Sequence, residues 1–150
     1  MPKALLAISR KVLIGLLVGP LLFALVVVTT FNGSYKFEIQ MNDPLTVLFL
    51  LMAIVILPVS IIVPKKQAQN IKVTDGLQKK LSTYQLVLIQ KAAFWEGIAL
   101  FGIVLCQIQE NLFPLTISLI AILIIASLYP NVNNIQKLIP LDPEDIRKLS

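Results

Sequence analysis

The chain contains no histidine and a single cysteine, Cys106. A lone cysteine cannot form an intramolecular disulfide, and without histidine the usual ligand sets of zinc, haem and iron–sulfur centres cannot be assembled. Charged residues make up 14% of the 150 residues, whereas soluble domains carry roughly 25%. We therefore expect no metal site and no cofactor, and the composition argues against a soluble globular protein.

What the chain has instead is apolar sequence, with 57% hydrophobic residues gathered in four long runs. A helix needs roughly 20 apolar residues to cross a bilayer. We predict an all-α polytopic membrane protein with four transmembrane helices forming a single domain. The predicted spans are residues 12–31, 44–63, 86–107 and 112–129. The segments between them are too short for an extramembrane catalytic domain.

The basic residues predict the orientation of these spans. Twelve of the thirteen Lys and Arg residues lie in or beside the N-terminal arm, residues 64–85 and residues 131–150, and the other side receives Lys36 alone. Positively charged segments stay in the cytoplasm. We expect both termini, a basic loop at 64–85 and a short tail at 131–150 on the cytoplasmic side of the inner membrane. Topology explains these charges, so we expect no nucleic-acid partner.

The first span resembles a signal peptide in its basic flank but is longer than the usual apolar region. No small-residue cleavage site follows at Thr29–Gly33, so we expect an uncleaved membrane anchor. The spans are expected to form two helical hairpins, one from spans one and two and one from spans three and four. Gly19–Val26 aligns with Gly97–Val104, which either a duplication or chance similarity between apolar helices explains.

The loop before the third span carries a helical signal. Thr74 or Asp75 is expected to cap a helix that begins near Gly76 and continues into the membrane. Four residues recur along it at helical spacing, forming an apolar stripe: Leu77, Leu81, Tyr84 and Leu88. The stripe is expected to pack on the other helices or to lie near lipid headgroups. In the tail, Asp142 before Pro143 predicts a short helix with a solvated end.

Glu96 is the sole acidic residue within the four apolar runs. A carboxylate at membrane depth costs roughly 2.5–3.5 kcal/mol on insertion scales, so it needs a proton, a partner or a role. Gln85 and Gln107 lie eleven residues before and after it, and eleven residues are about three helical turns. The three side chains should therefore share one polar face directed at protein. Lys91 is off that face and should snorkel to the cytoplasmic interface.

Small residues accompany this polar face. Gly15 and Gly19 in the first span, and Ala93 and Gly97 in the third, are each four residues apart. Such pairs let helix backbones approach closely in membranes. Because Glu96 and Gly19 lie at a similar predicted depth, we expect the first and third helices to meet beside Glu96.

Residues 44–107 resemble the hairpin of rotary ATPase proteolipids (subunit c). In that family a polar cytoplasmic loop joins two helices, and the second helix carries an acid near its middle, as Glu96–Val104 does here. The resemblance implies that Glu96 is an ion-binding carboxylate. The glycine repeat of that family's first helix has no counterpart in Val47–Ser60. The whole chain also resembles small four-helix bacterial membrane proteins without an assigned function.

Three functions fit these observations. The first is a non-enzymatic structural or accessory subunit that packs against membrane lipids and against other membrane proteins or itself. The second is a proton- or cation-translocating oligomer with Glu96 as the carrier. The third, an intramembrane enzyme acting on lipid, would need clustered catalytic groups near one interface. In the first reading Glu96 is a hydrogen-bonded packing residue or a contact to a partner subunit.

Overall fold

The computed structural model describes residues 2–30 and 33–149. Phe31, the predicted end of the first span, lies outside these ranges. Within them the chain is all-α, as predicted, apart from one isolated bridge between Lys36 and Asn111. The helices are α1 (Pro2–Thr29), α2 (Pro44–Ala68), α3 (Leu77–Gln109), α4 (Leu112–Ser127), α5 (Val132–Gln136) and α6 (Pro143–Leu149).

Three of these helices, α1, α2 and α3, are long and apolar enough to cross a membrane. Large apolar side chains remain exposed along them, including Leu22 and Phe23 on α1 and Ile54 on α2. Exposed apolar surface of this extent requires a nonaqueous neighbour. These features indicate a membrane protein.

The fourth apolar run forms a shorter helix than predicted. α4 contains 16 residues, which corresponds to about 24 Å, against a hydrocarbon core of about 30 Å. It ends at Ser127 because the backbone turns there and Pro130 follows. Asn134 then donates from its amide group to the Tyr129 carbonyl oxygen at 2.9 Å, which fixes the connection to α5.

The long helices extend beyond the predicted spans at the end where the termini lie. α1 begins at Pro2, α2 continues to Ala68 and α3 begins at Leu77. Hydropathy marks the apolar part of a helix, whereas the backbone hydrogen bonds continue through Lys, Gln and Ala, which also favour helix. The predicted spans therefore identify the helices but not their full lengths.

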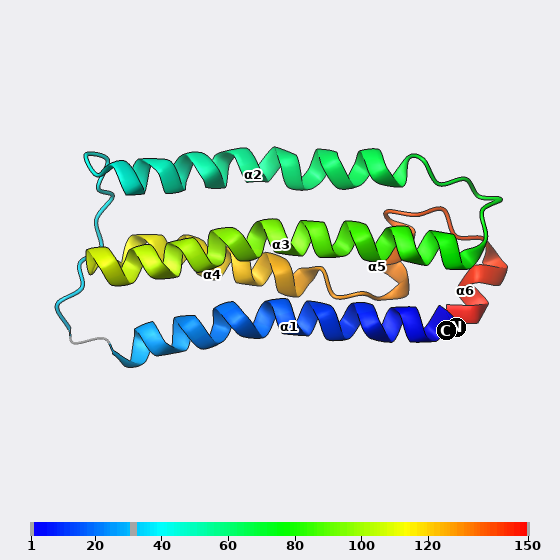
Figure 1. The fold of residues 1–150 in the computed structure, drawn as a ribbon, viewed down its shortest axis with the longest axis horizontal. Helices are drawn as coiled ribbons and strands as arrows, with labels where there is room; N and C mark the ends of the chain where they lie inside the picture. Colours follow the sequence, from blue (N-terminus) through cyan, green and yellow to red (C-terminus); the bar gives the residue numbers. More distant parts are fainter. Residues whose placement is uncertain (1, 31–32, 150) are drawn as a thin grey trace.

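α3 is the central helix of the molecule. It packs against α1, α2 and α4, and α1 also packs against α4. Figure 1 shows α1 and α2 on opposite sides of α3. The predicted first hairpin is therefore wrong as a packed pair, because α3 separates its two helices. The connection after α1 is long enough to pass the end of α3, while the tight turn between α3 and α4 holds those two helices together.

That turn is fixed by the connection between α1 and α2. Glu110 ends α3 with a left-handed backbone (φ 50°), a conformation uncommon for residues other than glycine. The Lys36 amide donates to the Glu110 carbonyl oxygen at 2.9 Å, and the Leu112 amide donates to the Lys36 carbonyl oxygen at 2.8 Å. These two hydrogen bonds attach the connecting segment to the start of α4.

The tail packs against the other end of the molecule. Ile135, Ile139 and Leu149 are buried, and Figure 1 shows α6 beside the starts of α3 and α1. The Asp145 amide donates to the Asp142 carboxylate at 2.7 Å, so the predicted cap at Asp142 is confirmed. The predicted solvated end is only partly right, because Glu144, Arg147 and Lys148 are exposed whereas Asp145 and Leu149 are buried.

The apolar stripe at the start of α3 packs inside the molecule. Leu81, Tyr84 and Leu88 are buried among α3 and the elements around it. The predicted caps at Thr74 and Asp75 are wrong, because Gly76 is the N-cap and makes no side-chain bond. Asp75 instead accepts from the Lys72 amide and pairs with Lys79. Both interactions lower the pKa of the Asp75 carboxyl, and the hydrogen bond from the Lys72 amide has the larger effect.

Candidate functional site

Glu96 lies at the seam between α3 and α1, as predicted. A Cβ atom built on Gly19 would be 3.7 Å from the Glu96 carboxylate oxygen Oε1. The Glu96 carboxylate therefore lies beside Gly19 on α1, at a distance that an added methyl group would meet in ordinary van der Waals contact. Glu96 is half-buried, and within the described residues no donor forms a hydrogen bond or ion pair with it. The fold therefore holds this carboxylate beside α1 but gives it no hydrogen-bond donor among the described residues.

The two glutamines on the same face of α3 differ in their surroundings. Gln85 is half-buried, while Gln107 is exposed and its side-chain oxygen accepts from the Tyr35 hydroxyl at 3.1 Å. Gln107 also borders an apolar groove between α3 and α1 that Phe23 and Val26 line. The polar face therefore follows the α1 seam instead of pointing into the centre of the bundle.

The close helix contact predicted at the small residues is made at Gly19 but not at the other three. Gly15, Ala93 and Gly97 are exposed, and open space surrounds the position of a Cβ on both glycines. Gly97 is the residue after Glu96, so its side-chain position lies about 100° around the helix. α1 approaches the Glu96 side of α3 and leaves the Ala93–Gly97 side uncovered.

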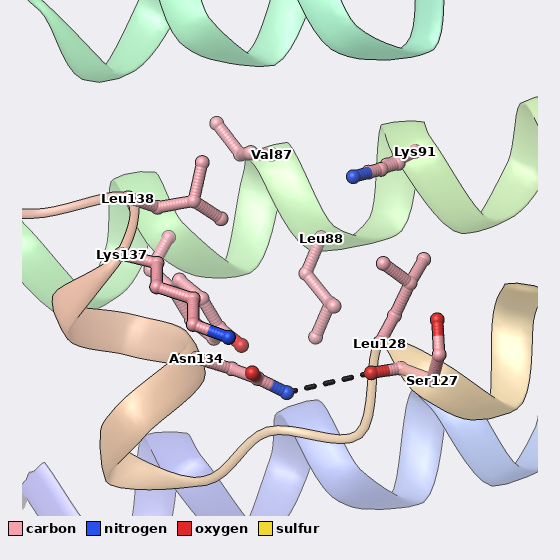
Figure 2. A pocket seen from close by; sticks show the side chains of 9 residues that line it. Val87, Leu88, Lys91, Ser127, Leu128, Asn134, Lys137 and Leu138 are labelled. Carbon is pink, nitrogen blue, oxygen red and sulfur yellow. Dashed lines mark hydrogen bonds between the residues drawn. The ribbon is translucent and has the colours of Figure 1, made fainter. Parts of the chain in front are cut away.

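Lys91 lines a cavity of about 240 Å³ at the level where α4 ends. The cavity lies between α3 and the segment from α4 to α5, and Figure 2 shows the ammonium groups of Lys91 and Lys137 on either side of Leu88. Its lining residues are Tyr84, Val87, Leu88, Lys91, Ser127, Leu128, Asn134, Lys137 and Leu138. Lys91 is half-buried. That its side chain reaches the cytoplasmic interface stays a prediction.

The glycine that the packing of α3 requires is Gly102, which the sequence pattern did not single out. A Cβ at Gly102 would lie 2.7 Å from the Phe49 ring and 2.8 Å from the Pro114 carbonyl oxygen, and closer still to the Ser118 hydroxyl. At Gly102, α3 therefore lies in close contact with α2 and α4. Helical spacing could not reveal it, because its neighbours come from other helices.

A polar cluster at the end of the bundle where α2 begins and α3 ends was also not predicted from the sequence. The Asp43 carboxylate accepts from the Thr46 amide at 2.7 Å and from the Gln109 side-chain amide at 2.6 Å. This arrangement caps α2 and attaches it to the end of α3. Asp43 before Pro44 is a recognisable cap signal, but its second partner is distant in sequence.

A buried ion pair joins α3 to the tail. The Lys80 ammonium is 2.6 Å from an Asp145 carboxylate oxygen, and their side chains are 1% and 8% exposed. Lysine is rarely buried in a protein unless it is paired with an acidic group. The pairing residue lies 65 positions later, so no local pattern indicates it.

Within residues 2–30 and 33–149, His, Cys, Asp and Glu side chains form no group that could hold a metal ion. Comparisons with protein-family models, curated proteins and solved structures found no match to this chain. The candidate site is defined by the geometry of the described residues. It consists of the Glu96 carboxylate at the α1 seam and the adjoining uncovered side of α3.

Proposed function

We propose that the protein is a non-enzymatic accessory subunit of the cytoplasmic membrane that binds another membrane protein, or a second copy of itself, through α3. In this proposal all four apolar helices cross the bilayer and both termini are cytoplasmic. The observation that carries the proposal is the uncovered side of α3, where Ala93 and Gly97 adjoin the unsatisfied Glu96 carboxylate.

The chemistry of this surface suits a partner helix. Ala93 and Gly97 are exposed small residues one helical turn apart, and small residues let a second backbone approach closely in a membrane. A donor on that partner would satisfy Glu96, whose isolation at membrane depth costs free energy. α1 and α2 lie on opposite sides of α3, and neither of them covers Ala93 or Gly97, which stay exposed.

The orientation is supported by charge. The exposed Lys65 and Lys66 end α2, and the basic residues of the tail lie at the same end of the molecule (Figure 1). The Asp43 cluster lies at the opposite end. Basic residues at one end and few at the other favour the first end as cytoplasmic.

The test is a steric block with a matched control. Ala93→Leu fills the uncovered side of α3, and Ala126→Leu makes the same change at an exposed position on α4. Each tagged full-length variant is extracted from its native membranes in a mild detergent, and its mass and co-purifying membrane proteins are measured. We expect wild type and Ala126→Leu to retain a partner or a second copy that Ala93→Leu loses. A wild-type protein that is monomeric and without a stoichiometric partner would refute the proposal.

A second candidate function is translocation of protons or cations, with Glu96 as the carrier. It is favoured by the half-exposed, unsatisfied carboxylate and by the resemblance of residues 44–107 to proteolipid hairpins. In reconstituted vesicles, Glu96→Gln should abolish a proton flux that Gln107→Ala retains. Equal flux in wild type and Glu96→Gln, with the same oligomer in both, would exclude this function and leave the accessory role.

A further inference from the structure

The cavity beside Lys91 combines positive charge with neutral hydrogen-bonding groups. Two lysines line it, together with Tyr84, Ser127 and Asn134, and none of its lining residues is acidic. Asn134 is held in place because its side-chain amide donates to the carbonyl oxygens of Ser127 and Tyr129, at 3.4 and 2.9 Å. The cavity therefore has one lining side chain, Asn134, held by hydrogen bonds, and its lining carries an excess of positive charge.

Neither lysine is neutralised by the protein itself. Among the described residues, the lysines that form ion pairs are Lys79 with Asp75, Lys80 with Asp145 and Lys148 with Glu144. Lys91 and Lys137 belong to none of them. Because Lys91 is half-buried, its charge is less well solvated than that of a surface lysine, and an anion in the cavity would compensate it.

The cavity lies at the edge of the apolar part of the molecule. It adjoins the end of α4, and a short distance along the chain Arg10 lies over the Tyr129 ring, 5.6 Å from its centroid, and donates to the Pro130 carbonyl oxygen. Tyrosine and basic residues gather where a bilayer meets water. A ligand in the cavity would therefore occupy the depth of lipid phosphate groups.

We propose that this cavity binds the phosphate group of a net-anionic molecule, with the ammonium groups of Lys91 and Lys137 as its charged donors. A cavity of about 240 Å³ is below the usual range of about 300–1,000 Å³ for drug-sized ligands. It suits a single headgroup or a small anion. The same chemistry could come from an anionic lipid of the inner leaflet or from a soluble phosphate compound.

The experiment measures binding to purified full-length protein with two probes. Native mass spectrometry from mixed micelles of phosphatidylglycerol and phosphatidylcholine reports lipid retention, and calorimetry reports binding of inorganic phosphate. The variants are Lys91→Gln and Lys137→Gln. The control is Lys66→Gln, which removes the same charge from an exposed lysine at the inner end of α2, away from the cavity. Lys137 is exposed, so its variant should fold even if Lys91→Gln does not.

We expect wild type to retain phosphatidylglycerol in preference to phosphatidylcholine. Each cavity variant should weaken that binding about five-fold, the effect of removing one basic residue near an anionic surface, and Lys66→Gln should leave it unchanged. Binding of inorganic phosphate that depends on Lys137, without a preference for phosphatidylglycerol, would also support the site and identify a soluble ligand. The proposal is overturned if Lys137→Gln binds both probes as wild type does, or if Lys66→Gln loses as much as the cavity variants.

Discussion

Two glycines on α3 show how differently the same residue type is used. Gly97 has open space where a side chain would lie, whereas Gly102 meets the Phe49 ring and the Pro114 carbonyl oxygen. Spacing favoured Gly97, because it forms a small-residue pair with Ala93. The structure assigns the tight packing to Gly102, since partners on α2 and α4 determine which glycine is indispensable.

The first prediction compares these two positions. Gly102→Ala should destabilise the protein by about 1–3 kcal/mol, because the added methyl group overpacks a closed contact. Gly97→Ala should be neutral or stabilising by up to about 1 kcal/mol, because alanine favours helix and meets nothing. Unfolding in mixed micelles with increasing SDS measures both. Equal stability of the two variants would contradict the assignment of Gly102 as the close-packing glycine.

At the scale of whole elements, a buried ion pair between Lys80 and Asp145 attaches α6 to α3. Lys79, the neighbouring residue, forms an exposed pair with Asp75 in which its own side chain is 64% exposed. Both lysines follow the cap of α3 and look alike in sequence. The tail packs over Lys80 and buries it, whereas Lys79 remains exposed to solvent.

The second prediction uses this pair of neighbours. Lys80→Met should cost about 3–5 kcal/mol, because it leaves the Asp145 carboxylate buried without a counter-charge. Lys79→Met should cost less than about 1 kcal/mol, as expected for an exposed ion pair. The measurements are SDS unfolding and the rate at which a protease removes the tail. The double variant Lys80→Met with Asp145→Leu should recover most of the stability, and failure to recover would indicate that α6 docks by other contacts.

The two ends of the molecule differ in chemistry. One end carries a polar cluster, and the other carries basic residues and is covered by the C-terminal tail. Asp43, Thr46 and Gln109 are joined at the first end, and α6 lies beside the start of α3 at the second (Figure 1). The apolar parts of α1, α2 and α3 lie between them. This division supports a single orientation across a bilayer.

The third prediction tests that orientation by thiol labelling in intact cells. Cys106, the native cysteine, is buried and is replaced in Cys106→Ser. On that background, the exposed positions Asn42 and Gln136 are changed singly in Asn42→Cys and Gln136→Cys. A membrane-impermeant maleimide should label the first variant from outside and the second only after the membrane is opened. Labelling in the reverse pattern would show that the termini face outward.

The sequence by itself determined which segments are helical and apolar, because membrane depth requires every backbone polar group to bond within its own segment. It also indicated the cap at Asp142, which is a local signal, and the approach of Gly19 to Glu96, because counting residues along each helix places the two at a similar depth. Only the tertiary structure decided that α3 separates α1 from α2, that Gly102 is the tight contact, and that Lys80 is buried by the tail. These features depend on partners distant in the chain, and one apolar helix surface offers no local signal of which neighbour will cover it.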